Sequence, residues 1–272
     1  MTDALWSGES KDPAYWDDAA NALIDRSDLE AGMHVLDVGS AGGGTMFPAL
    51  KRIGPSGHIV GIEMEEDWAE WLQKRIAERS IPNAENLRMD TCAMSFPDAS
   101  FDAVIVGLVG LDDDYDLHRG EVINGAPLMS EAFRVLGPGR KIHVSGWLVE
   151  EDNDWMGELV RRHLPGCNKR GYFPMTADEL SEILEFVGFE DIQAARFKGE
   201  YTFESPGEWM AGIGHIWEEE LATIQADPSL CAAFERDALD LLRKNTKPDG
   251  TIPYTRVVLL ISARKPLTPS QP

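Results

Sequence analysis

The most constraining feature of this 272-residue chain is a short apolar run that ends in a cluster of glycines. Residues 35–38 read Val-Leu-Asp-Val, and they are followed by Gly39 and by three consecutive glycines at 42–44. A short apolar run bounded by glycines is typical of a buried parallel strand that turns tightly into a helix. Because glycine has no Cβ and tolerates positive φ, such a turn lets a ligand lie against bare backbone. We therefore expect a ligand-binding loop at 39–44.

A second predicted strand, 58–62, is followed directly by Glu63. An acidic side chain at this point can accept hydrogen bonds from two ribose hydroxyls. The dinucleotide pattern G-x-G-x-x-G does not fit, because Phe47 stands where its third glycine should be. Asp37 would repel a diphosphate and suits a ligand that carries positive charge. A nucleoside with a cationic group, such as S-adenosylmethionine, fits this combination better than a dinucleotide.

Two further motifs follow along the chain. The stretch 88–102 reads Arg-Met-Asp-Thr-Cys-Ala-Met-Ser-Phe-Pro-Asp-Ala-Ser-Phe-Asp, and the stretch 126–139 ends in Gly-Pro-Gly. Together with the glycine turn and Glu63, these motifs resemble the class I S-adenosylmethionine-dependent methyltransferases, in particular the ubiquinone/menaquinone methyltransferase-like branch. The resemblance extends over residues 15–265 and is strongest over 35–146. It implies S-adenosylmethionine as the cofactor and methyl transfer as the activity.

The resemblance also implies which residues bind the cofactor. In the family, the first loop holds the methionine part, the acid after the second strand holds the ribose, and the third motif meets the adenine. The helix at the N-terminus covers the cofactor in relatives, and the loop after the fourth strand borders it. The matching positions are Asp37, Gly39, Ser40, Ala41, Gly43, Glu63, Met64, Asp90, Thr91, Cys92, Gly107 and Tyr15. Relatives usually have glycine in place of Ala41, and alanine restricts φ, so we expect a slightly different loop shape.

Predicted strands and helices alternate along the chain. The strands are 35–38, 58–62, 87–90, 103–106, 141–146, 190–197 and 254–263, and the helices are 13–29, 45–52, 65–79, 121–136 and 176–187. This alternation predicts an α/β fold with a doubly wound, mostly parallel sheet. From the resemblance we expect seven strands in the order 3-2-1-4-5-7-6, with the last strand antiparallel.

Two segments, 147–175 and 202–250, lie outside this predicted core. Both follow the carboxyl ends of strands, where ligands bind in open α/β sheets. We therefore expect them to form a helical lid over the acceptor pocket, with helices at 206–226 and 229–245. The predicted organisation is a cofactor-binding core at 1–146, a lid insertion at 147–175, a core helix and strand at 176–201, a helical lid at 202–250, a last core strand at 251–265 and a tail at 266–272.

The residues that contact the methyl acceptor are harder to predict. Methyl transfer mainly needs alignment, exclusion of water and removal of a proton, so it requires no fixed catalytic motif. The loop after the fourth strand offers His118 and Tyr115 as candidate bases. Many relatives carry histidine near Leu111, and its absence here argues against quinone-type C-methylation. The same loop holds an acidic cluster that either attracts a cationic amine acceptor or forms a solvated loop or helix cap: Asp112, Asp113, Asp114 and Asp116.

Aromatic residues outside the core have two interpretations, a pocket for an aromatic acceptor or ordinary packing. They are Trp147, Trp155, Tyr172, Phe173, Trp209 and Trp217, with His215 beside them.

The net charge of −22 disfavours nucleic acids and anionic membranes as partners. Cys92, Cys167 and Cys231 are widely spaced, which predicts free thiols in a reducing cytoplasm and no zinc pair. We expect no metal site, no secretory signal and no membrane insertion. The leading hypothesis is a cytoplasmic methyltransferase acting on a small molecule. The alternatives are a methyltransferase fold that catalyses another reaction, such as a cyclisation, and a ligand-binding module without activity. The acceptor and the oligomeric state stay open.

Overall fold

The computed structural model describes residues 3–6, 14–167 and 175–267. The chain divides into two compact units. The larger unit comprises residues 16–146, 175–197 and 258–272, and the smaller unit comprises residues 1–15, 147–174 and 198–257. Three long strands, β7 (Leu136–Glu150), β8 (Glu190–Phe203) and β9 (Ile252–Arg264), each contribute residues to both units.

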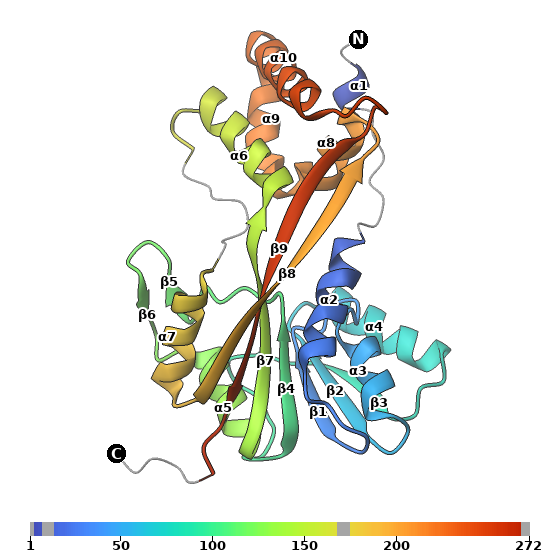
Figure 1. Ribbon diagram of the computed structural model, residues 1–272, viewed down its shortest axis with the longest axis vertical. Coiled ribbons are helices and arrows are strands. Elements are labelled where there is room, and N and C mark those ends of the chain that lie inside the picture. Colours follow the sequence, from blue (N-terminus) through green and yellow to red (C-terminus); the bar gives the residue numbers. More distant parts are fainter. Residues whose placement is uncertain (1–2, 7–13, 168–174, 268–272) are drawn as a thin grey trace. The chain divides into compact units, whose positions relative to one another are not determined.

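Seven strands of the described chain form one sheet in the order β3-β2-β1-β4-β7-β9-β8 (Figure 1). Its remaining members are β1 (His34–Val38), β2 (His58–Glu63), β3 (Ala84–Arg88) and β4 (Phe101–Gly107). β1 pairs in parallel with both β2 and β4, β2 with β3, and β4 with β7, while the last strand runs antiparallel. Numbered by sheet strand, this is the predicted order 3-2-1-4-5-7-6, and the predicted fold class is confirmed.

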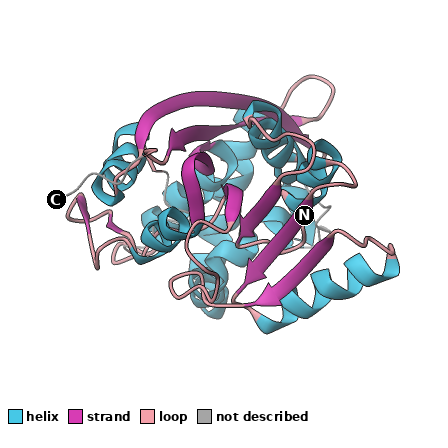
Figure 2. Ribbon diagram, turned by 90° about the horizontal axis from the view of Figure 1, so that it is seen from below, coloured by secondary structure: helices cyan, strands magenta, loops and turns pink. Residues whose placement is uncertain are grey.

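The central strands are apolar because helices cover the sheet. In β1 every residue after His34 is buried, as in parallel sheets enclosed on both faces. The helices of the larger unit are α2 (Tyr15–Arg26), α3 (Met46–Ile53), α4 (Glu66–Glu78), α5 (Pro127–Val135) and α7 (Ala177–Val187). Figure 1 shows α2, α3 and α4 toward one side of the sheet and α5 and α7 toward the other, and Figure 2 shows the twist of the strands.

Several predicted element boundaries differ from the structure, two of them for a clear reason. The predicted strand 87–90 is β3, which begins at Ala84, because Ala84 pairs with Ile59 and a buried Asn86 interrupts the apolar pattern. The predicted helix 121–136 begins only at Pro127, since Gly125 has a φ of +76°. The segment before it forms a hairpin of β5 (Tyr115–Asp116) and β6 (Glu121–Val122).

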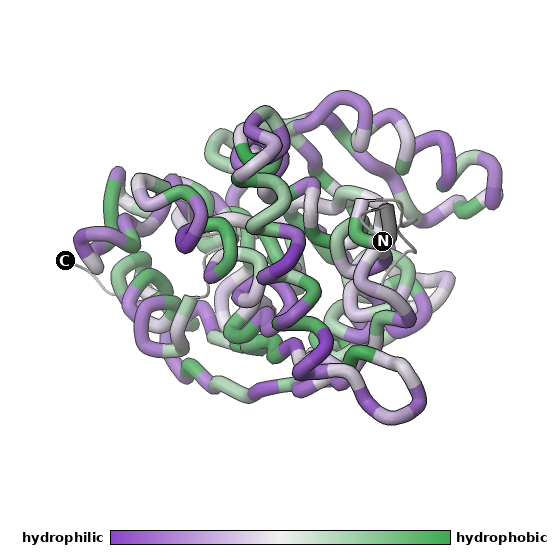
Figure 3. The backbone as a smooth tube through the Cα atoms, turned by 90° about the horizontal axis from the view of Figure 1, so that it is seen from above, coloured by the Kyte–Doolittle hydropathy of each residue, from purple (hydrophilic) through white to green (hydrophobic). Residues whose placement is uncertain are grey.

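The smaller unit is mostly helical. Its helices are α1 (Asp3–Trp6), α6 (Glu151–His163), α8 (Pro206–Ile213), the 3₁₀ helix η1 (Gly214–Trp217), α9 (Glu218–Ala226) and α10 (Pro228–Asn245). The single helix predicted at 206–226 is therefore broken at Gly214, and α6 lies in the predicted lid insertion, for which we gave no helix bounds. The helices are amphipathic, with hydrophobic and hydrophilic residues interspersed along them (Figure 3).

The core of the smaller unit is built around two buried tryptophans. Trp209 donates its Nε1 hydrogen to the Asp152 carbonyl oxygen at 3.0 Å, and Trp217 donates to the Asn153 Oδ1 at 2.8 Å. A buried indole needs such a partner, and both acceptors lie in the first turn of α6. Across the described part of the chain, every helix is too short or too polar to cross a membrane.

Candidate functional site

The loop after β1 is the tight turn that the glycines predict. The amides of Gly39 and Ser40 both donate to the Ile62 carbonyl oxygen, at 2.9 and 3.0 Å, which fastens the loop to the end of β2. Gly39 has a φ of +67°, and a Cβ there would lie 2.5 Å from the Val109 Cγ2. Gly43 has a φ of +81°, and a Cβ there would lie 2.7 Å from a ring atom of Phe47. Both positions therefore require glycine.

Ala41 takes a conformation that glycine would adopt more easily. Its φ is +38°, which places an alanine in the left-handed region at a cost of about 1–2 kcal/mol. Its amide donates to the Glu63 Oε2 at 3.0 Å, and this bond to a carboxylate offsets part of the cost. The loop thus holds an alanine in a backbone conformation that glycine would adopt more easily, and the predicted difference in loop shape from relatives stays a prediction.

Asp37 is a fully buried carboxylate at the end of β1. The Thr45 hydroxyl, just before α3, lies 2.7 and 2.9 Å from its two oxygens. Burial raises the pKa of Asp37 to about 7; the Thr45 hydrogen bond opposes the shift, and the nearby Glu63 charge adds to it. Near neutral pH this group is therefore poised to ionise when a cation arrives, because an opposite charge favours the carboxylate form.

Three carboxylates lie at the carboxyl ends of three adjacent strands: Asp37 on β1, Glu63 on β2 and Asp90 after β3. The Glu63 Oε1 accepts the Glu65 amide at 3.1 Å, and the Asp90 Oδ1 accepts the Cys92 amide at 2.8 Å. Backbone bonds of this kind fix the side chains but leave lone pairs available. The set can accept hydrogen bonds from hydroxyls and amines, and it would repel phosphate.

The strand order reverses between β1 and β4, and ligands of open α/β sheets bind at the carboxyl ends of the strands at such a point. The two loops that leave these strands contact each other there. A Cβ at Gly107 would lie 2.5 Å from the Cγ2 of Thr45, the residue that holds Asp37. The predicted cofactor residues after β1, β2 and β4 thus belong to one connected group of loops in the larger unit.

Two members of the acidic cluster after β4 have structural roles. Asp114 is buried, and its two oxygens accept the amides of Leu128 and Met129, both at 3.0 Å, in the first turn of α5. Asp116 accepts the amides of His118 and Arg119 at 2.9 and 3.1 Å. Of the two interpretations given for this cluster, the helix cap holds for Asp114, and Asp116 fixes a turn.

The candidate bases lie in the β5–β6 hairpin region. The Tyr115 hydroxyl donates to the Glu182 carboxylate at 3.2 Å, and burial together with Glu182 raises the pKa of Tyr115 above its usual value. A tyrosine must lose its proton to act as a base, so this environment works against that role. His118 is exposed. The assignment of either residue as a base stays a prediction.

Tyr15 belongs to the smaller unit, where the Arg256 guanidinium lies 3.7 Å from its ring centre. Its predicted contact with the cofactor stays a prediction. Trp209 and Trp217 are almost completely buried, so packing is the right interpretation for these two. Tyr172 and Phe173 lie outside the described residues.

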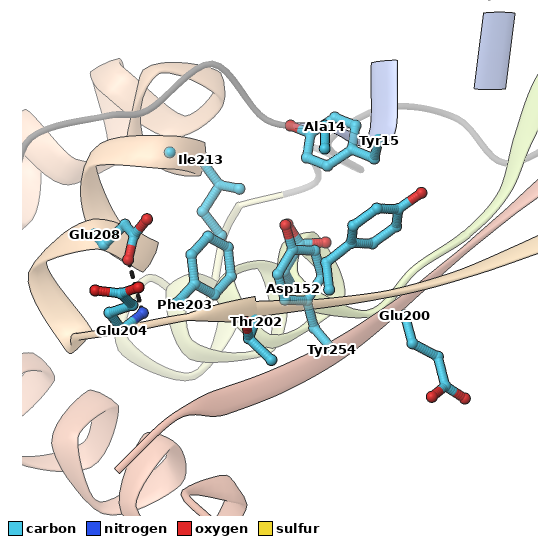
Figure 4. Close-up of a pocket in the computed structure, with 12 residues that line it drawn as sticks. Ala14, Tyr15, Asp152, Glu200, Thr202, Phe203, Glu204, Glu208, Ile213 and Tyr254 are labelled. Atoms are coloured by element: carbon cyan, nitrogen blue, oxygen red, sulfur yellow. Dashed lines mark hydrogen bonds between the residues drawn. The ribbon is translucent and has the colours of Figure 1, made fainter. Parts of the chain in front are cut away.

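The smaller unit contains a cavity of about 380 Å³ that the sequence did not lead us to expect (Figure 4). Its aromatic lining includes Tyr201, Phe203 and Tyr254, none of which we predicted to line a pocket. The spacing of Tyr201 and Phe203 on one strand is the available signal, because residues two apart on a strand point to the same face.

Comparisons with known proteins agree with this geometry. Residues 35–139 match the model of a family described as a methyltransferase domain. The aklanonic acid methyltransferase DauC of Streptomyces sp. (strain C5) is 35% identical over 180 residues, which cover 61% of this chain and 79% of that protein. The nocamycin O-methyltransferase of Saccharothrix syringae is 35% identical over 89 residues, which cover 33% of this chain and only 32% of that protein.

Solved structures share the fold. The YcgJ protein of Bacillus subtilis has a TM-score of 0.58 at 15% identity, covering 92% of this chain and 98% of that chain. The [4+2]-cyclase SpnF has a TM-score of 0.55 at 19% identity, covering 97% of this chain and 88% of that chain. At such identities the likeness concerns the fold alone.

The sheet order and the loop group at its switch point define a class I methyltransferase fold. This chain belongs to the S-adenosylmethionine-dependent methyltransferases, and its cofactor is S-adenosylmethionine.

Proposed function

We propose that this protein transfers a methyl group from S-adenosylmethionine to a small-molecule acceptor. One observation carries the proposal: the buried Asp37 and the half-buried Glu63 flank a turn in which Gly39 and Gly43 leave the backbone bare. These two negatively charged hydrogen-bond acceptors match the amine, the sulfonium and the ribose hydroxyls of the cofactor. The curated relatives named above are methyltransferases by name, which supports the same activity.

Each group of this loop has a part in the proposed binding. Asp37 lies at the end of β1 and supplies a negative charge for the methionine end. Glu63 accepts hydrogen bonds from the ribose hydroxyls, and Asp90 with the Thr91–Cys92 backbone receives the adenine. When bound, S-adenosylmethionine supplies a methyl group on a positively charged sulfur, which leaves as a neutral thioether. The chain's task is then to align the acceptor atom behind that methyl carbon and to exclude water.

The proton of the acceptor, where it has one, must leave to a base or to water. His118 is the base that we propose, because histidine is the side chain best suited to accept and pass on a proton at physiological pH. The three cysteines are free thiols, which supports a reducing compartment such as the cytoplasm as the place of action.

The test is calorimetric binding of S-adenosylhomocysteine. The wild type should bind, and the isosteric Asp37→Asn variant should bind about tenfold to a hundredfold more weakly, since it loses a hydrogen bond to a charged group. Asp25→Asn, on the exposed end of α2, is the matched control and should bind like the wild type. Equal affinity of Asp37→Asn and wild type would refute the assignment.

Product analysis separates methyl transfer from the cyclisation alternative. Mass spectrometry of an acceptor product should show the added mass of one CH₂ group. A product of unchanged mass would instead identify an isomerisation carried out on the same fold.

A further inference from the structure

The cavity of the smaller unit has a continuous aromatic wall. The ring centres of Tyr15 and Tyr201 lie 5.8 Å apart, and those of Tyr201 and Tyr254 lie 5.6 Å apart. Tyr254 stacks on Phe203 with a centroid distance of 4.3 Å and an angle of 11° between the ring planes. All four rings line the cavity, whose volume of about 380 Å³ is in the range of small-molecule sites.

The polar part of the cavity lining is acidic. Asp152, Glu200, Glu204 and Glu208 contribute four carboxyl groups, and no lysine, arginine or histidine is among the lining residues that the structure describes. Glu204 and Glu208 lie toward one end of the cavity and Glu200 toward the other (Figure 4). Glu200 pairs with Lys198 at 2.9 Å, and the Glu208 carboxylate accepts the Glu204 amide at 2.7 Å. An anionic ligand would be repelled here, and a cationic ligand would be attracted.

Behind this wall, one buried guanidinium faces two buried carboxyl groups. Arg256 contacts Glu150 at 2.7 Å and Asp152 at 2.9 and 3.1 Å, and all three residues are less than 5% exposed. The group therefore contributes no excess of positive charge to the cavity. The same guanidinium lies 3.7 Å from the centre of the Tyr15 ring, so the aromatic wall already receives one cation from within the chain.

We propose that this cavity binds an organic cation, an ammonium group carried on an aromatic or apolar frame. The ring faces supply cation–π attraction and apolar contact, and the carboxylates select the sign of the charge. A neutral ligand of the same shape uses only the apolar contact. The inference goes beyond the proposed function, which concerns the cofactor loop of the larger unit.

The test compares two probes of equal shape and different charge. Benzyltrimethylammonium carries the cation, and 2,2-dimethylpropylbenzene replaces its nitrogen by carbon. Calorimetry on the whole protein should show the cation binding about tenfold more tightly than the neutral isostere. Binding of the two probes within twofold of each other would overturn the proposal, as would tighter binding of benzenesulfonate.

Variants connect the binding to this cavity. Tyr201→Ala should weaken binding of the cation about tenfold, and Tyr201→Phe, which keeps the ring, should retain it. Glu204→Gln should weaken binding of the cation by a smaller factor. Glu190→Gln is the control and should leave binding unchanged, because Glu190 is exposed and lies at the start of β8, in the larger unit. Melting curves establish that each variant is folded. If folded Tyr201→Ala and Glu204→Gln bind the cation as tightly as the wild type does, the cavity is the wrong site.

Binding of S-adenosylhomocysteine is measured on the same samples. If S-adenosylhomocysteine binds but neither probe does, the proposed cation site is refuted and the proposed function is unaffected. If the cation binds more tightly than its neutral isostere but S-adenosylhomocysteine does not bind, the cavity assignment stands and the proposed function is refuted.

Discussion

Replacing Asp37 by asparagine should stabilise the protein, and by more at higher pH. Its carboxyl group is completely buried, and its pKa is raised from 3.8 to about 7. Between these two values the folded state binds more protons than the unfolded state, so the stability of the wild type falls as pH rises through this window. Asparagine has nearly the same shape and no charge to bury.

The magnitude follows from the shift. One pKa unit corresponds to about 1.4 kcal/mol, so ionising Asp37 in the folded protein costs about 4 kcal/mol once the pH exceeds 7. About 2–3 kcal/mol of this cost develops between pH 5 and pH 8. The free energy of unfolding of Asp37→Asn, minus that of the wild type, should rise by this amount over the same range.

Urea unfolding at pH 5, 6, 7 and 8 measures this difference, with the exposed Asp25→Asn variant as the control for loss of a charge. A difference that does not change with pH would refute the reasoning, because it would mean that Asp37 ionises as easily in the folded protein as in the unfolded chain. A destabilised Asp37→Asn at pH 8 would refute it as well. The wild type should also bind S-adenosylmethionine more tightly as pH rises through 7, since the cationic ligand prefers the ionised carboxylate.

Three further substitutions test the surrounding framework. Gly43→Ala should destabilise the protein by about 2–4 kcal/mol in thermal unfolding, because its φ is +81° and a Cβ would meet Phe47. Gly42→Ala should be nearly neutral, because a Cβ there would make only ordinary van der Waals contacts. Arg256→Met should cost about 3–5 kcal/mol by leaving buried carboxylates unpaired, and adding Glu150→Gln should recover part of that loss. Asp114→Ala should cost about 1–2 kcal/mol, because α5 loses the acceptor for its first amides; an unchanged urea midpoint would contradict this role.

The features that could be predicted from sequence are those encoded by neighbouring residues. The glycine turn after residue 38 and the acid at 63 depend on local backbone conformation and strand length, so their pattern is visible in a single chain. The order of the outer strands came from the resemblance, since no local signal fixes which strand pairs with which.

The features that could not be predicted depend on contacts between distant residues. The start of α5 is fixed partly by Asp114, which lies 14 residues before Leu128, and the acidic run around it looks like any solvated loop. The aromatic cavity joins Tyr15, Tyr201 and Tyr254, from three separate segments of the chain. Trp209 and Trp217 have a helical spacing that suits a pocket and a core equally, and only their burial decides between the two.

Ionising the buried Asp37 is unfavourable in the free protein, and a cationic ligand should make it favourable. In the free protein, burial and the nearby charge of Glu63 both disfavour ionisation of Asp37. A bound cation offsets both effects, so part of the binding free energy goes into charging a group that the fold keeps about half protonated near pH 7. Binding near neutral pH should therefore release a proton, and the measured heat should vary with the ionisation enthalpy of the buffer. This coupling also explains why a substitution that stabilises the fold should weaken the site, as expected when a functional group is held in an unfavourable environment.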